Sequence, residues 1–146
     1  SLVGASAAYP HGDQSNARLA RGDFLLVDTG GAFHGYQSDI TRTWCVEGEP
    51  SAEALRAWHA VRTAQQRAFE AIRPGVRCAE IDRVARAALA EAGYGAGYEH
   101  LTHRLGHGIG MEGHEDPYFD GGSEVVLEPG MTLSDEPGVY VYGSFG

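Results

Sequence analysis

A proline-glycine break in the middle of the chain separates two long amphipathic helical patterns. From Ser51 to Ile72 apolar residues recur every three to four positions, and Pro74-Gly75 ends this run. A second pattern of the same period covers residues 79–92 and stops at Gly93. The apolar positions expected to face the core are Leu55, Trp58, Val61, Ala64, Ala68, Phe69 and Ile72 in the first helix, and Ile81, Val84, Ala85, Ala88 and Leu89 in the second.

Strand-like segments flank the two helices. Residues 24–28, FLLVD, form a continuous apolar run, and YQSDITRTWCV follows at 36–46, so the pair is expected to form two antiparallel strands. Strand-like segments return at 123–127 and 138–142, whereas residues 1–22 have the composition of a loop or short extended structure. Strands, then two helices, then strands predict one α+β domain of 146 residues.

The charge balance and the cysteines limit the classes of partner. A formal net charge of −9 repels nucleic acid and anionic membranes. The two cysteines, Cys45 and Cys78, lack Cys-x-x-Cys spacing, which favours reduced thiols over a disulfide framework. No apolar run approaches 18 residues and no signal-peptide pattern is present, so we expect a soluble, cytoplasmic protein.

Two aspartates stand on the first pair of predicted strands. If these strands pair about the bond between Phe33 and His34, Asp28 and Asp39 face each other directly. Directly opposed residues have Cβ atoms about 4.5–5.5 Å apart, where like charges destabilise a sheet. Divalent cations would offset this repulsion, and two such ions about 3.5–4 Å apart fit between facing carboxylates. The alternative is that one aspartate points to solvent or caps the turn at Gly30-Gly31.

The segment HRLGHGIGMEGHEDP, residues 103–117, gathers His103, His107 and His114 among glycines. Imidazole is the commonest side-chain metal ligand and moves protons near pH 7, although a structural role remains the alternative for each histidine. The match of residues 108–113 to the dinucleotide fingerprint GxGxxG lacks a strand-to-helix context. The four-residue spacing of the first two histidines also lacks the glutamate of a helical HExxH zinc site.

A further acid lies near the end of the chain, in LSDEPGVYVYGSFG. Glu136 stands between apolar residues and the turn Pro137-Gly138, where burying an unpaired carboxylate is costly. A metal ion shared with His107 would give it a partner, whereas a position exposed beside Asp135 would need none.

Three ordered motifs, VDTGGAFHGYQSDITRTW, LGHGIGMEGHEDP and LEPGMTLSDEPGVY, closely resemble the pita-bread metallopeptidases. The resemblance covers nearly the whole chain, including the leading PHGDQSNARLARGD and both helices. SDITRT and the early Pro10-His11 favour the proline-specific branch, which contains the prolidases (Xaa-Pro dipeptidases) and aminopeptidases P. It implies a pita-bread fold, with a curved antiparallel sheet and helices on its outer face, and hydrolysis of Xaa-Pro bonds in dipeptides or short peptides.

The resemblance also implies roles for individual residues. Asp28 would hold one metal ion, Asp39 would bridge two, and His107 and Glu136 would hold the second. The histidines expected to bind substrate and shuttle protons are His11, His103 and His114. Family chemistry implies a hydroxide bridging two divalent ions, and the carboxylate-rich ligands favour Mn²⁺ over Zn²⁺, with Co²⁺ also possible. A homodimer is a further implication.

The sequence departs from the family pattern at its end. Relatives continue beyond a segment such as YVYGSFG into a strand of the form V-R-I-E-D, whose glutamate is the fifth ligand, whereas the printed sequence ends at Gly146. We also expect residues 1–146 to lack the N-terminal domain usual in these enzymes. Residues 1–146 are therefore expected to be a catalytic pita-bread domain without its last strand or strands, with weak metal occupancy and little activity, unless Glu115 or Asp135 substitutes.

Two other functions remain open on the sequence. A creatinase-like C–N hydrolase would use the histidines without metal, but it would have no reason to keep two facing aspartates. A non-catalytic binding module would keep the fold as an interaction platform. The choice between dipeptidase and aminopeptidase depends on the room beyond proline, which these residues do not define.

Overall fold

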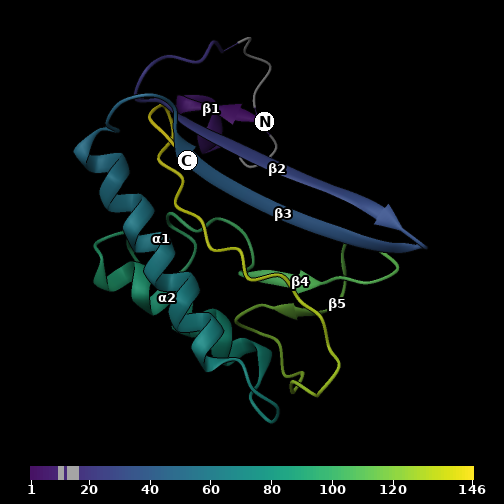
Figure 1. Ribbon diagram of the computed structural model, residues 1–146. Helices are drawn as coiled ribbons and strands as arrows, with labels where there is room; N and C mark the ends of the chain where they lie inside the picture. The colour runs from purple at the N-terminus through teal and green to yellow at the C-terminus, as the bar shows by residue number, and fades with distance from the viewer. Residues whose placement is uncertain (10–11, 13–16) are drawn as a thin grey trace.

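The two amphipathic patterns form helices α1 (Ala52–Ala71) and α2 (Cys78–Glu91) in a computed structural model that describes residues 1–9, 12 and 17–146. The helices lie side by side on one side of the molecule (Figure 1). α1 begins after Ser51, whose hydroxyl accepts a hydrogen bond from the amide of Ala54 at 3.1 Å. Both predicted helices are confirmed to within a residue at each end.

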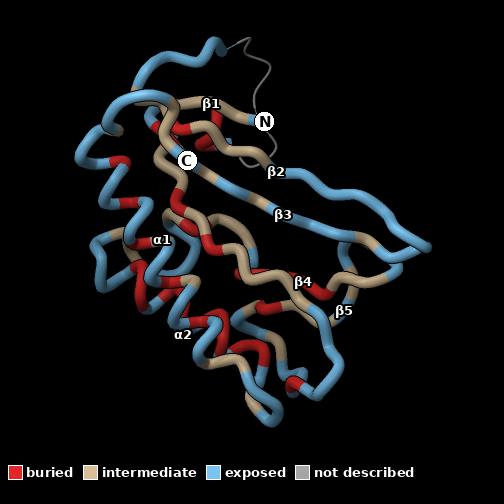
Figure 2. The backbone as a smooth tube through the Cα atoms, in the orientation of Figure 1, coloured by how far each residue is buried: buried red, intermediate tan, exposed pale blue. Residues whose placement is uncertain are grey.

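The buried face of α1 matches the predicted one in part, because Ala64 and Ala68 are buried as expected. The buried residues are all alanines: Ala54, Ala57, Ala60, Ala64 and Ala68. Leu55, Trp58 and Phe69 were expected in the core, but they are exposed. Alanines on the inner face let α1 approach α2 closely, and the tube view shows the buried positions of both helices where they meet (Figure 2). The core positions Ile81, Ala85, Ala88 and Leu89 of α2 are confirmed.

The strands form two antiparallel sheets. Their bounds are β1 Leu2–Val3, β2 Phe24–Phe33, β3 Tyr36–Cys45, β4 Gly106–Gly108 and β5 Glu115–Phe119. One sheet has the order β1-β2-β3, and the other consists of β4 and β5. With the two helices these sheets confirm the α+β class. Within the described residues no helix is both long and apolar enough to cross a membrane.

The register of the β2–β3 hairpin differs from the predicted one. Phe33 pairs with Tyr36, which leaves His34 and Gly35 as a two-residue turn. Their φ angles of 49° and 86° are both positive, as in the type I′ turn that suits the twist of a hairpin. Asp28 therefore faces Thr41 and Asp39 faces Gly30, so the predicted direct opposition of the two aspartates is wrong. They are diagonal neighbours on one face of the hairpin.

The segments 123–127 and 138–142 do not form strands in the part of the chain that the structure describes. They contribute isolated bridges, Arg77 with Val126 and Val141 with Phe145. The first segment instead gives its carbonyl groups to the start of α2, because the amide of Cys78 donates to Val125 at 2.9 Å. Free amides at the beginning of a helix need such acceptors, and this use competes with a strand ladder.

Both ends of the chain pack near β1. A short 3₁₀ helix, η1 (Gly4–Ala8), follows β1, where the sequence predicted only loop or extended structure. Phe145 joins Phe24 of β2 in the hydrophobic core. The last segment, yellow in Figure 1, runs between α1 and the β2–β3 hairpin, and Gln65 of α1 donates to its Asp135 carbonyl at 3.1 Å.

Candidate metal and substrate site

His107 lies in the middle of β4, the short strand on which the site is built. Its amide donates to the hydroxyl of Ser134 at 2.9 Å, and its carbonyl accepts from the amide of Ser134 at 2.8 Å. The neighbours Gly106 and Gly108 have no room for a side chain, because a Cβ there would press against the carbonyl oxygens of Ser134 and Glu115. The glycines thus let two other segments close around the histidine.

The ring of His107 places an unpartnered nitrogen between two acids. Its Nδ1 lies 2.9 Å from the Gly108 carbonyl, which can only accept, so we assign the proton to Nδ1. The other nitrogen, Nε2, lies 2.9 Å from Oε1 of Glu136 and 3.3 Å from Oδ2 of Asp39. Nε2 is buried and makes no hydrogen bond with any residue that the structure describes. A lone pair and two carboxylates facing one point repel one another unless a proton or a metal cation lies between them.

The hairpin brings Asp39 to this point from far along the chain. The amide of Gln37 donates to the carbonyl of Gly110 at 2.7 Å, which ties β3 to the loop before His114. Ligand atoms of Asp39, His107 and His114 lie within 4.8 Å of one another. The two imidazole centroids are 3.9 Å apart. His114, predicted on the substrate side, therefore lies inside the cluster of possible ligands.

Glu136 is positioned by its neighbours in sequence. The Ser134 hydroxyl donates to its Oε1 at 2.7 Å, and its own amide donates to the Leu105 carbonyl at 3.0 Å. Next to it, the two carboxylate oxygens of Asp135 are buried and have no hydrogen-bond partner within residues 1–9, 12 and 17–146. Burial, followed by the negative charge of Glu136, raises the pKa of Asp135 to about 7.

His103 is paired with a tyrosine that the sequence did not single out. Its Nδ1 lies 2.6 Å from the Arg104 carbonyl, so we assign a proton there, and its Nε2 accepts from the Tyr140 hydroxyl at 2.8 Å. Burial, then the charges of Glu136 and Asp28, raise the pKa of Tyr140 to about 12. Tyr140 therefore keeps its proton at neutral pH. In the sequence it follows Val139 in an apolar run, which favours a packing role.

Every predicted site residue within the described part of the chain lines one cavity of ≈ 1020 Å³. These residues are Asp28, Asp39, His103, His107, His114 and Glu136. Asp28 stands apart from the ligand group around His107, in keeping with its diagonal position in the hairpin. His11, the remaining predicted residue, lies outside the described residues.

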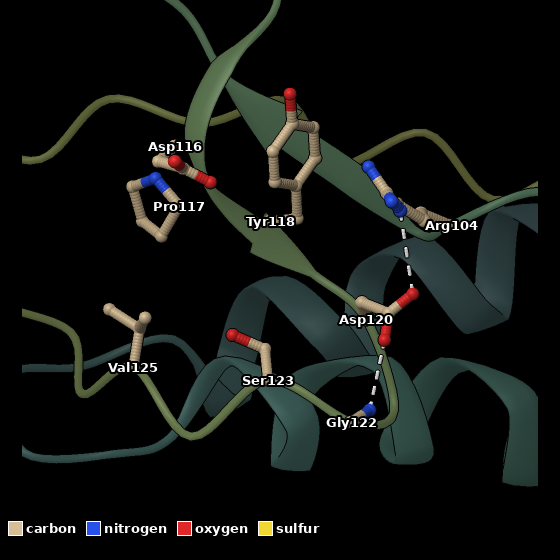
Figure 3. A pocket seen from close by; sticks show the side chains of 8 residues that line it. All are labelled: Arg104, Asp116, Pro117, Tyr118, Asp120, Gly122, Ser123 and Val125. Carbon is tan, nitrogen blue, oxygen red and sulfur yellow. Dashed lines mark hydrogen bonds and ion pairs between the residues drawn. The ribbon is translucent and has the colours of Figure 1, made fainter.

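A smaller pocket of ≈ 260 Å³ lies on the other side of Arg104 (Figure 3). The Arg104 guanidinium lies over the ring of Tyr118, 4.3 Å from its centroid, and its Nε is 3.4 Å from Oδ2 of Asp120. Asp120 also accepts from the amide of Gly122 at 2.9 Å through its Oδ1, so both of its oxygens are paired. None of the four predicted metal ligands, Asp28, Asp39, His107 and Glu136, lines this pocket.

The fold is that of a metallopeptidase family. The model of metallopeptidase family M24 matches residues 1–146, and the chain belongs to this family. It is 46% identical over 144 residues to the probable dipeptidase PepE of Mycobacterium tuberculosis, covering 98% of this chain and 37% of that protein. It is 45% identical over 144 residues to the Xaa-Pro dipeptidase of Lactobacillus delbrueckii subsp. lactis, covering 99% of this chain and 38% of that protein.

A comparison with solved structures supports the same family. The prolidase from Pyrococcus furiosus superposes with a TM-score of 0.91 at 40% identity, covering 99% of this chain and 42% of that chain. The predicted pita-bread fold and the predicted family are confirmed. The chain spans less than two fifths of the length of the two curated relatives described above.

Proposed function

We propose that these residues form the metal-binding part of a peptidase that hydrolyses Xaa-Pro bonds in dipeptides or short peptides. The observation that carries the proposal is the buried Nε2 of His107, which faces oxygens of Asp39 and Glu136 without a hydrogen bond. A relative with 45% identity is an Xaa-Pro dipeptidase, which supports the choice of substrate.

The donor set fits a divalent metal ion. The Nδ1–H of His107 is held by a backbone carbonyl, an arrangement that fixes the ring so that Nε2 can bind metal. Asp39 and Glu136 would share that ion, and Asp28, further along the same cavity wall, would hold a second. Divalent ions at these ligands would acidify a water molecule and polarise the scissile carbonyl. Because carboxylate oxygens outnumber imidazoles, we propose Mn²⁺ as the metal.

The remaining polar side chains of the cavity would handle substrate and protons. Nε2 of His103 accepts from the Tyr140 hydroxyl, so the pair can bind a carbonyl or carboxylate oxygen and pass a proton through these two atoms. His114 is exposed and its ring contacts that of His107, which places it to bind substrate or to add a ligand. His11 is proposed to join them on the strength of the family resemblance.

The two alternative functions, a metal-free C–N hydrolase and a non-catalytic binding module, fit the cavity less well. A metal-free hydrolase would need a proton on Nε2 of His107 to offset the two facing carboxylates, whereas a metal ion offsets them and uses the lone pair as a ligand. A binding module has no need for His103, His107 and His114 along one cavity wall. We further propose a cytoplasmic location, a homodimer, and weak metal binding and low activity for residues 1–146 by themselves.

The test is a hydrolysis assay on the protein at its full natural length, with whatever segments flank these residues. We expect Mn²⁺-stimulated cleavage of Leu-Pro, slower cleavage of Leu-Ala, and loss of activity in His107→Ala and after chelation. The His59→Ala variant is the control, because His59 is an exposed histidine on α1. Absence of Leu-Pro cleavage with Mn²⁺, or cleavage that survives chelation, would overturn the proposal.

A further inference from the structure

A buried ion pair on α2 lies outside the cavity described above. Nε of Arg86 is 2.8 Å from Oδ2 of Asp82, one turn earlier on the helix, and the two side chains are 10% and 2% exposed. Removing two charges from water costs more than their attraction returns unless further hydrogen bonds satisfy them. The remaining polar atoms of both side chains therefore need hydrogen-bond partners.

The free nitrogens of Arg86 bind the loop that follows the helix. Nη1 donates to the carbonyls of Gly97 and Leu101 at 2.7 and 2.9 Å, and Nη2 donates to the carbonyl of His103 at 2.7 Å. The ring of Tyr98 covers the guanidinium, with its centroid 4.0 Å from Cζ. A planar fork with five donors can hold three carbonyls and a carboxylate at once, which a lysine ammonium cannot.

Asp82 holds the same loop two residues further on. Its Oδ1 accepts from the amide of Leu105 at 3.3 Å, and that amide also donates to the Phe119 carbonyl at 3.0 Å. The carbonyl of Leu105 accepts from the amide of Glu136. The ion pair thus contacts the backbone on both sides of Arg104, immediately before the strand that carries His107.

We propose that Asp82 and Arg86 are positioning residues that fix the 97–105 segment, and through it set His103 against Tyr140 and His107 against Asp39 and Glu136. This inference rests on the proposed function for its catalytic consequence. Its structural consequence is independent: with its carbonyl fixed by Arg86, His103 keeps its Nδ1 proton on the Arg104 carbonyl and its Nε2 on the Tyr140 hydroxyl.

The test is the Arg86→Lys variant of the full-length protein, which keeps the charge beside Asp82 but cannot span the carbonyls. Arg83→Lys is the control, because Arg83 is exposed on the same helix. In ¹⁵N NMR spectra of the imidazoles, we expect the Nδ1–H tautomer of His103 in the parent and the control. In Arg86→Lys we expect that signature to be lost, kcat for Leu-Pro to fall at least about tenfold, and KM to change little.

A lower melting temperature with the His103 tautomer and kcat unchanged would overturn the proposal, because it would reduce the pair to a stability element. If Arg86→Lys does not fold, Tyr98→Leu replaces it, since Tyr98 is 53% exposed and packs on the guanidinium. In Tyr98→Leu we expect a smaller loss of the Nδ1–H signature of His103 and a smaller fall in kcat. An unchanged His103 tautomer would overturn the proposal. Failure of the parent to cleave Leu-Pro would overturn the proposed function, whereas the tautomer would still decide the positioning role.

Discussion

Tyr140 couples the candidate site to the stability of the fold at high pH. Its pKa is raised from 10.0 to about 12 in the folded protein, so its proton is retained there after the unfolded chain has lost it. The contribution to stability is complete below pH 10 and is lost as the pH rises through 12. Two pKa units correspond to about 2–3 kcal/mol.

We therefore expect the Tyr140→Phe variant to lose less stability than the parent between pH 9 and about pH 11.5, by about 2 kcal/mol. Urea unfolding at a series of pH values, with chelator present, measures this difference. Tyr36→Phe is the matched control, because Tyr36 is 63% exposed on β3. Parallel pH profiles for the parent and Tyr140→Phe would show that burial does not hold the phenol proton.

The sequence pointed to some residues of the site and missed others. His107 and Glu136 were singled out as candidates because one lies among glycines and the other is an acid between apolar residues, and the family resemblance gave both the role of metal ligands. Tyr140, Asp82 and Arg86 were missed. A phenol in an apolar run has the pattern of a core residue, but the charged pair four apart on the apolar face of α2 was a readable signal.

The β2–β3 hairpin positions Asp39 through its register, and Gly30 makes that register possible. Gly30 faces Asp39, and a Cβ at Gly30 would press against the backbone carbonyl of Ser38. Gly31, the next residue, has open space around the corresponding position. The adjacent glycines therefore form a natural pair of test and control.

We expect Gly30→Ala to destabilise the protein by about 1–3 kcal/mol and to weaken Mn²⁺ binding, because β3 must shift to relieve the collision. Gly31→Ala should leave both properties nearly unchanged. Thermal unfolding and metal titration of the two variants check this. Similar behaviour of the two variants would mean that the close approach of Gly30 to Ser38 does not set the position of Asp39.

The elements themselves were predicted where a local pattern determines them and mispredicted where a contact from elsewhere decides. The extents of α1 and α2 follow from the apolar period and from the breaks at Pro74-Gly75 and Gly93. The register of the hairpin depends on whether the turn is centred before or after His34, and its Gly35 was the informative residue. The buried alanines of α1 depend on how closely α2 approaches, which hydropathy does not encode.

Across the whole molecule, the site is assembled from three regions that are distant in sequence. Asp39 comes from the hairpin, His107 from β4 and Glu136 from the final segment. Backbone hydrogen bonds join β4 and its flanking residues to each of the other two regions. The family was predictable because three ordered motifs carry these regions. The convergence of their side chains was not, since it depends on the long-range pairing of the residues around Gly110 and Ser134.

The most direct test of a cation at this convergence is a calorimetric titration with Mn²⁺ at neutral pH. We expect saturable binding to the full-length parent protein, binding at least about tenfold weaker in its His107→Ala variant, and parent-like binding in its His59→Ala variant. Circular dichroism of each variant checks whether the fold is kept. Equal Mn²⁺ affinity in His107→Ala and the parent, or no binding to the parent at millimolar Mn²⁺, would contradict a metal site at His107, Asp39 and Glu136.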